Sequence, residues 1–217
     1  MLVAAFGVSA GALALPAAAA TAKVTVPKSA TVPLDGDCFD LPVKIQPPSG
    51  VDHWSVDVDV ANAGSTFDYG DDDSAATAEL QHCAGLDGVG RFTWSAKLEW
   101  GNFEQDTEGE RTFSGSFTIH KAKRTGKLKI SDTTPEYRQQ VRFKTCVPGP
   151  RYVTYKLQVK ASGKTASKTY STGSTGCDTR KLKWPESRKP VKYRLHIPGD
   201  DTTKSFTGKW VTIRGHA

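Results

Sequence analysis

The side chains in this sequence that are best suited to bind a ligand are lysines and arginines at every second residue of short apolar segments. Lys156 and Lys160 alternate with apolar residues, and so do Lys192 and Arg194. Because successive side chains of a strand point to opposite faces, this spacing gives each strand one apolar and one cationic face. Such a face attracts phosphate and other anionic groups. The residues that we expect to form a polyanion-binding surface are Lys156, Lys160, Lys192, Arg194, Arg142 and Lys144.

The charges are divided unevenly along the chain. Residues 23–120 hold 6 Lys and Arg against 17 Asp and Glu, while residues 121–217 hold 23 against 6. The overall charge of +6 therefore hides a half at −11 and a half at +17. We expect the basic half to contact an anionic cell-envelope polymer or an acidic protein surface. Solubility alone is the alternative explanation, and no helix-turn-helix, zinc-finger or RNP pattern supports sequence-specific nucleic-acid binding.

An acidic loop in the first half is the one candidate metal site. Its carboxylates are Asp68, Asp71, Asp72 and Asp73, and Gly70 lies among them. Clustered carboxylate oxygens suit Ca²⁺, but the spacing is not that of an EF-hand, and no Glu closes the loop at position 12. A solvated surface turn is the preferred explanation of the loop. Ca²⁺ is the only cofactor considered.

Catalytic motifs are missing from the sequence. It has no Gly-x-Ser-x-Gly, His-Glu-x-x-His or phosphate-loop pattern, and its histidines are scattered, at positions 53, 82, 120, 196 and 216. We therefore predict a binding module without enzymatic activity. Two alternatives stay open: a secreted hydrolase on a β-sandwich scaffold, and a calcium-dependent carbohydrate or adhesion module. For the latter, Trp100 and Phe103 flank a turn and are the aromatic residues expected to be exposed, whereas Trp94 is expected in the core.

Four cysteines indicate two disulfides. Cys38, Cys83, Cys146 and Cys177 contain no Cys-x-x-Cys spacing, and no histidine lies at zinc-ligand spacing from a pair of them. Three pairings are possible, and the simplest joins Cys38 to Cys83 and Cys146 to Cys177. In the chain-entropy model, loops of 45 and 31 residues would each be worth about 4 kcal/mol.

The N-terminal segment predicts export. Residues 1–22 carry no charge and end in Ala20-Thr21-Ala22, which is typical of a signal peptide cleaved before Lys23. The segment lacks a basic n-region, which we explain by a start upstream of Met1. We expect a secreted, extracellular protein with no transmembrane span after cleavage. The Ala-rich leader, two Asn and five Ile resemble the composition of secretory proteins from GC-rich bacteria.

Internal similarity predicts two copies of one domain. The segment from Phe113 to Ile119 parallels that from Phe206 to Ile213, and Val56–Gly64 parallels Tyr155–Gly163. The copies meet near residues 121–126. One landmark departs from this alignment, because Cys38 begins its expected strand (38–46) whereas Cys146 ends its own (139–146). Either the alignment slips there or the two disulfides are not equivalent.

Period-two alternation throughout both copies predicts an all-β fold. We expect two tandem antiparallel β-sandwich domains of immunoglobulin-like size, each with one disulfide. The boundaries are 1–22 for the signal peptide, 23–120 for the acidic domain and 121–217 for the basic domain. Only residues 74–82 read as a possible helix, and they read almost equally well as a strand. The order Cys38, Trp54, Cys83 resembles that of immunoglobulin domains, but two strand candidates follow Cys83, so we assign the architecture alone.

Overall fold

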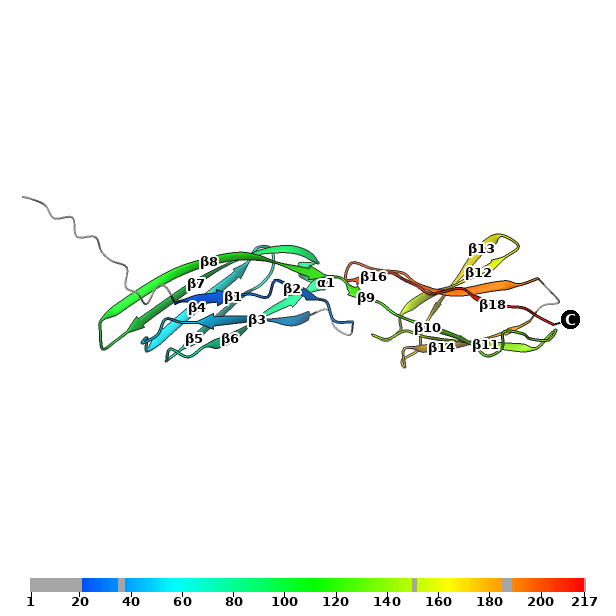
Figure 1. Ribbon diagram of the computed structural model, residues 1–217, viewed down its shortest axis with the longest axis horizontal. Coiled ribbons are helices and arrows are strands. Elements are labelled where there is room, and N and C mark those ends of the chain that lie inside the picture. Colours follow the sequence, from blue (N-terminus) through cyan, green and yellow to red (C-terminus); the bar gives the residue numbers. More distant parts are fainter. Residues whose placement is uncertain (1–20, 35–37, 150–151, 185–188, 217) are drawn as a thin grey trace, which may run out of the picture.

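The computed structural model describes residues 21–34, 38–149, 152–184 and 189–216. Within these residues the chain is built from β-strands and one short helix, α1 (Ala84–Asp87). No helix in this part of the chain is long and apolar enough to cross a membrane. The strands form two sandwiches that follow each other along the longest axis of the molecule (Figure 1).

The first sandwich packs a three-stranded sheet against a five-stranded one. The smaller sheet has the order β1 (Lys23–Thr25), β3 (Cys38–Gln46), β6 (Ala76–Cys83). The larger has the order β2 (Ser29–Thr31), β8 (Thr107–His120), β7 (Gly90–Asn102), β4 (His53–Val60), β5 (Ser65–Gly70). All neighbours are antiparallel except β2 and β8, which are parallel.

The second sandwich repeats this strand order. Its smaller sheet is β10 (Lys127–Ile130), β11 (Gln140–Cys146), β14 (Cys177–Lys183). Its larger sheet is β13 (Lys164–Ser171), β12 (Thr154–Ala161), β15 (Val191–Ile197), and β15 pairs in turn with β17 (Phe206–Thr207) and β18 (Val211–Ile213). Two strands depart from a one-to-one match, because β2 has no counterpart and β17 and β18 share the place of β8. The common strand order confirms the predicted fold class of two tandem β-sandwiches.

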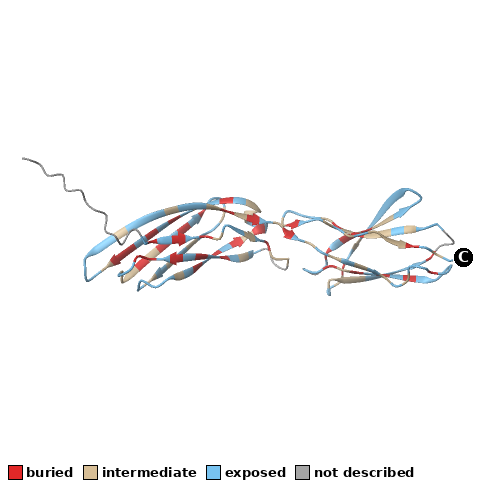
Figure 2. Ribbon diagram, viewed as in Figure 1, coloured by how far each residue is buried: buried red, intermediate tan, exposed pale blue. Residues whose placement is uncertain are grey.

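Alternation along each strand builds the cores. Val56, Val58 and Val60 of β4 are buried, while Asp57 and Asp59 between them are exposed. Burial of apolar area stabilises such a core by roughly 25 cal/mol per Å². Figure 2 shows buried and exposed residues following one another along the strands of both sandwiches. In the second sandwich the buried residues form two smaller clusters, around Phe143 and around Tyr155.

Glycines opposite aromatic residues shape the larger sheet of the first sandwich. Trp54 lies directly across from Gly70, Trp100 from Gly109, and Trp94 from Gly115. A Cβ atom at Gly70 would lie 2.5 Å from the Trp54 indole nitrogen. The indoles therefore cover the glycines of the neighbouring strands, and a side chain there would displace a ring. Trp100 is buried, so the expectation that it is exposed was wrong.

Both predicted disulfides are present. Cys38 pairs with Cys83, and Cys146 pairs with Cys177. Each joins directly opposite residues of neighbouring strands within one sheet, β3 to β6 and β11 to β14. Cys38 begins β3 whereas Cys146 ends the equivalent strand β11, so the bridges clamp the same strand pair at opposite ends. The two disulfides are therefore not equivalent, and the internal alignment does not slip.

Two further expectations concern single segments. Residues 76–83 form strand β6, so the strand interpretation of residues 74–82 was the right one. Most of the predicted signal peptide, residues 1–20, lies outside the described residues. Ala22, next to the expected cleavage site, is packed against the first core, and cleavage before Lys23 stays a prediction.

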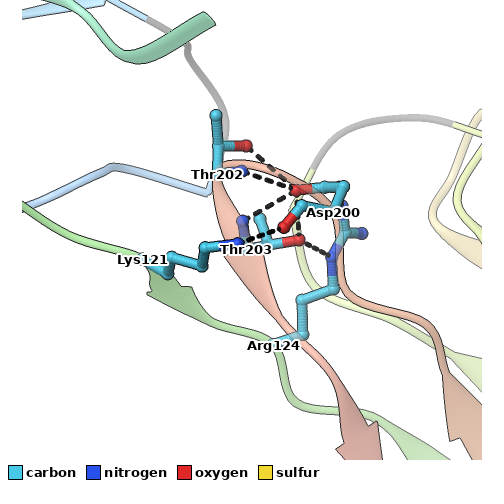
Figure 3. A network of polar contacts seen from close by, with 5 residues as sticks. All are labelled: Lys121, Arg124, Asp200, Thr202 and Thr203. Carbon is cyan, nitrogen blue, oxygen red and sulfur yellow. Dashed lines mark hydrogen bonds and ion pairs between the residues drawn. The ribbon is translucent and has the colours of Figure 1, made fainter. Parts of the chain in front are cut away.

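A polar network fastens the segment between the sandwiches (Figure 3). The segment β9 (Ala122–Lys123) pairs in parallel with β16 (Thr203–Lys204). Arg124 donates a hydrogen bond to the Asp200 carboxylate (2.7 Å), and Lys121 donates one to the Asp200 carbonyl oxygen (2.8 Å). The same carboxylate accepts hydrogen bonds from Thr202 and Thr203. Since the side chain of Ala122 packs in the first core, this network connects that core to the second sandwich.

We expect Gly70→Val to destabilise the first sandwich by about 1–3 kcal/mol, because the new side chain overlaps the Trp54 indole. Ser65→Val, on the exposed outer row of the same strand, is the control, and β-branched residues favour strands. Calorimetric unfolding of the full chain measures both. Equal midpoints for the two variants would contradict the packing described here.

Asp200→Asn tests the network between the sandwiches. Burial alone would raise the pKa of Asp200, but hydrogen bonds from Thr203, Thr202 and Arg124 outweigh it and lower the pKa from 3.8 to about 2. A lowered pKa stabilises the fold above the unfolded value and stops doing so as the carboxylate protonates. We therefore expect the wild-type advantage over the variant in unfolding midpoint to be full at neutral pH and to shrink between about pH 4 and 2. A gap that is constant over this range, or equally large for the exposed Asp201→Asn control, would contradict the assignment.

Candidate functional site

The six residues predicted to bind polyanions lie on two different faces. Arg142 and Lys144 belong to β11, on the outer side of the smaller sheet of the second sandwich. Lys156 and Lys160 of β12 lie beside Lys192 and Arg194 of β15, on the outer side of the larger sheet. The sequence pattern thus identified outward rows correctly, while the structure separates them into two surfaces.

The first surface, which we call the β11 face, is a cationic band across three strands. Register places Lys129 opposite Lys144 and Arg142 opposite Lys181. Each strand contributes two cations, displaced by one step from strand to strand, so the band runs diagonally. All six are exposed. The residues of the β11 face are Lys127, Lys129, Arg142, Lys144, Lys181 and Lys183.

Sequence reasoning missed Lys181 and Lys183. They lie in the run Arg180-Lys181-Leu182-Lys183, where cations occupy both phases of the strand. The pattern alone does not show which of them point outward. The pairing of β14 with β11 does, because Lys181 lies across from Arg142 and Lys183 from Gln140.

The charge arrangement of the β11 face lowers the stability of its sheet. Like charges directly across an antiparallel pair destabilise a sheet, and both Lys129–Lys144 and Arg142–Lys181 are such pairs. Strands are about 4.8 Å apart, and same-face residues along a strand about 6.8 Å. Among the described residues, none of these six cations has a salt bridge. The face therefore holds a positive field that only solvent, counterions or a bound anion can neutralise.

The acids of the second sandwich lie elsewhere. Asp178, on the inner row of β14, accepts hydrogen bonds from Tyr155 (2.7 Å) and Arg180 (2.6 Å). Burial and the bond to Asp178 raise the pKa of Tyr155 to about 12, so the phenol stays protonated. Asp200 is held by Arg124, and Asp132 accepts hydrogen bonds from its own loop. Internal contacts thus occupy these carboxylates, and none of them is on the β11 face.

The second surface, the β12 face, consists of Lys156, Lys160, Lys192 and Arg194. Lys160 lies directly across from Lys192, again a like-charge pair. The Arg194 guanidinium lies over the Trp210 ring at 4.3 Å and donates a hydrogen bond to Gln158 (2.6 Å). Near the end of this face, Lys160, Lys189 and Lys192 line a hollow of about 290 Å³. Three lysines around one hollow make the end of the β12 face suited to an anionic group.

The first sandwich shows the opposite charge on its larger sheet. Glu99 and Glu110 lie across from each other on β7 and β8, and Lys97 forms salt bridges with both. These bonds, from Glu110 first and Glu99 second, raise the pKa of Lys97. An open cleft of about 580 Å³ beside them is lined by His53, Glu99, Glu108 and Glu110, among others. Phe103 is exposed as predicted and stacks on His53 at 4.2 Å.

Three carboxylates of the expected calcium loop accept hydrogen bonds from backbone amides. Asp73 accepts a hydrogen bond from the Gly50 amide, Asp72 from the Ser74 amide, and Asp68 from the Tyr69 amide. In the part of the chain that the structure describes, no three His, Cys, Asp or Glu side chains are grouped to hold a metal ion. Calcium binding by this loop stays a prediction.

The histidines serve separate local contacts. His53 is hydrogen-bonded to Asp52 (2.6 Å), His82 to the Gly88 carbonyl (3.0 Å), and His196 to Thr207 (2.9 Å). His82 is buried among aromatic rings, where it packs against Phe92 and Phe39. These contacts give these three rings a structural explanation, and none among them links a hydroxyl, an imidazole and a carboxylate in one chain.

Comparison with known proteins finds solved structures that are similar to this chain. No protein-family model matches the sequence, and no curated protein matches it. The chain is similar to the FN1–FN3 domains of chicken CNTN1, with 9% identity, a TM-score of 0.33 and coverage of 89% of this chain, but it spans only 64% of that one. It is also similar to the chicken interferon gamma receptor alpha chain, at 11% identity and a TM-score of 0.37, with 89% of this chain and 97% of that one covered. A two-domain fibronectin type-III segment of chicken tenascin shows 10% identity and a TM-score of 0.36, over 89% of this chain and 98% of that one.

We expect micromolar Ca²⁺ to leave the unfolding midpoint of the first sandwich unchanged, because the loop carboxylates serve separate amides. Extracellular modules with partial ligand sets bind Ca²⁺ at roughly 10⁻⁴–10⁻³ M. Calorimetry with Ca²⁺ and with a chelator measures the effect, and Asp71→Asn is the variant to compare. A rise of several degrees at micromolar Ca²⁺ that is lost in this variant would show a tighter site than expected.

Proposed function

We propose that this protein is a secreted binding module without catalysis, and that its second sandwich binds a linear anionic polymer through the β11 face. The observation that supports the proposal is the diagonal band of six exposed cations, which contains two like-charge pairs and no carboxylate. The like-charge pairs of such a face lower the stability of the free protein. Binding of a polyanion is favoured because it releases the counterions of the polyanion.

The composition of the β11 face favours a phosphodiester polymer without bases. Five of its six cations are lysines, whose compact ammonium groups bind phosphate as point charges from any direction. No aromatic residue lies on its three outward rows, so bases and sugar rings have no stacking partner there. The β11 face also has no helix and no separate two-stranded ribbon, the elements that the DNA major groove admits. Poly(glycerol phosphate) has the required chemistry, since its backbone alternates a phosphate with a short, uncharged linker.

The first sandwich supports an oriented mode of binding. Its net charge is −11, and its larger sheet carries Glu99, Glu108 and Glu110 around one cleft. An anionic polymer is repelled there and attracted to the second sandwich, so the chain would bind with its C-terminal half toward the polymer. Two disulfides are typical of an oxidising, extracellular compartment, which agrees with the predicted signal peptide.

Salt dependence of binding tests the proposal. We expect the full mature chain to bind poly(glycerol phosphate) with an affinity that falls steeply between about 50 and 300 mM salt, since each neutralised phosphate of a single strand contributes about −0.7 to the log–log slope. Changing Lys129, Arg142, Lys144 and Lys181 to Gln should flatten the slope by up to about 3. Calorimetric titration across the salt series measures both.

The matched control removes the same charge elsewhere. Lys123, Lys164, Lys168 and Lys204 belong to the second half of the chain but lie on neither face, and their change to Gln should leave the slope nearly as it is. Equal losses in the two variants would mean that net charge alone binds the polymer. Tighter binding to heparin or duplex DNA than to poly(glycerol phosphate) would contradict the choice of polymer.

A further inference from the structure

We infer that the second sandwich holds two polymer segments at once, one on each face, and therefore cross-links the polymer that it binds. The inference rests on the proposed function and extends it from binding to bridging. The β11 face and the β12 face are the outer sides of two sheets packed against each other (Figure 1). A single domain thus presents cations in opposite directions.

The two faces are separate surfaces. Facing sheets of a sandwich are about 10 Å apart, and the buried residues between them include Phe143 and Leu157. The cations of each face extend away from this core into solvent. A polymer segment seated on one face therefore cannot reach the cations of the other without passing around an edge of the sandwich.

Each face can hold its own segment. The β11 face offers the diagonal band, with the like-charge pair of Lys129 and Lys144 at its centre. The β12 face offers Lys156, the like-charge pair of Lys160 and Lys192, and the lysine-lined hollow of about 290 Å³. Both surfaces thus carry an unfavourable charge arrangement that an anion relieves. A single segment bound to one face would leave the like-charge pair of the other face without a neutralising anion.

The edge strand between the faces carries cations in one of its two rows. The row of β13 on the side of the β12 face consists of the uncharged residues Thr165, Ser167, Thr169 and Ser171, while Lys164 and Lys168 occupy the alternate row. Lys168 and Arg180 both lie over the Tyr170 ring, and Arg180 is also paired with Asp178. A long polymer therefore meets cations on its way around this edge, so short oligomers are needed to distinguish two bound segments from one wrapped segment.

Stoichiometry with short oligomers is the first measurement. Oligomers of poly(glycerol phosphate) that are shorter than the path around the sandwich separate the two cases, and we expect two of them to bind each wild-type chain in calorimetric titration. The β11-face variant (Lys129, Arg142, Lys144 and Lys181 to Gln) and the β12-face variant (Lys156, Lys160 and Lys192 to Gln) should each bind one. Arg194 is left unchanged because its contacts with Trp210 and Gln158 support the fold.

Light scattering with long polymer is the second measurement. Wild-type chains should give a scattering maximum at an intermediate protein-to-polymer ratio, and the maximum should disappear with excess protein, because each segment is then saturated on its own. Both single-face variants should bind the long polymer and give no maximum. The charge-matched control (Lys123, Lys164, Lys168 and Lys204 to Gln) should scatter as the wild type does, and circular dichroism checks that every variant is folded.

The outcomes separate this inference from the proposed function. Binding of one oligomer per wild-type chain, or a scattering maximum retained by either single-face variant, overturns bridging and leaves binding by the β11 face intact. A retained maximum would point instead to association between copies, with the acidic sandwich of one chain against the basic sandwich of another. Wild-type protein that binds no poly(glycerol phosphate) overturns both.

Discussion

The period of two along each strand is the constraint on which the rest of this structure depends. In a sandwich every strand must give one row of side chains to the core, and the other row is left to water. Val141 and Phe143 of β11 are buried, and this leaves Arg142 and Lys144 free of any demand from folding. The two sandwiches satisfy the inner row with similar apolar residues and fill the outer row with opposite charges. One architecture therefore carries two different surfaces.

The distribution of carboxylates decides which outer rows keep uncompensated positive charge. In the first sandwich, Lys97 lies between Glu99 and Glu110, so its charge is neutralised locally. In the second, Asp178 points inward to Tyr155 and Arg180, and Asp200 serves the segment between the sandwiches. Six or four cations on an outer face would be ordinary if acids were interspersed among them. Placement of the described acids away from these two faces is what leaves the β11 and β12 faces with uncompensated charge.

Local patterns in the sequence were enough to predict the strands, the pairing of the cysteines and the outward phase of the cations. The alternation of Lys156 and Lys160 with apolar residues is visible without any long-range information. Which strands neighbour each other is not, because pairing depends on contacts between residues far apart in the chain. The sequence alone therefore grouped Arg142 with Arg194, which belong to opposite sheets, and it gave no reason to include Lys181. Trp100 was misjudged for the same reason, since its cover comes from the position of Gly109 on the next strand.

The division of charge also sets how the two halves influence each other. At physiological ionic strength the Debye length is about 8 Å, so the acidic sandwich screens the basic one only where the two come close. Arg124, just after that boundary in sequence, is paired with Asp200. The β11 face begins at Lys127 and lies on a sheet that extends away from the first sandwich (Figure 1). The fastening by Asp200 keeps the segment between the sandwiches in register with β16. With these contacts the two sandwiches follow each other along the long axis of the molecule, and the first sandwich does not cover the strands of the β11 face (Figure 1).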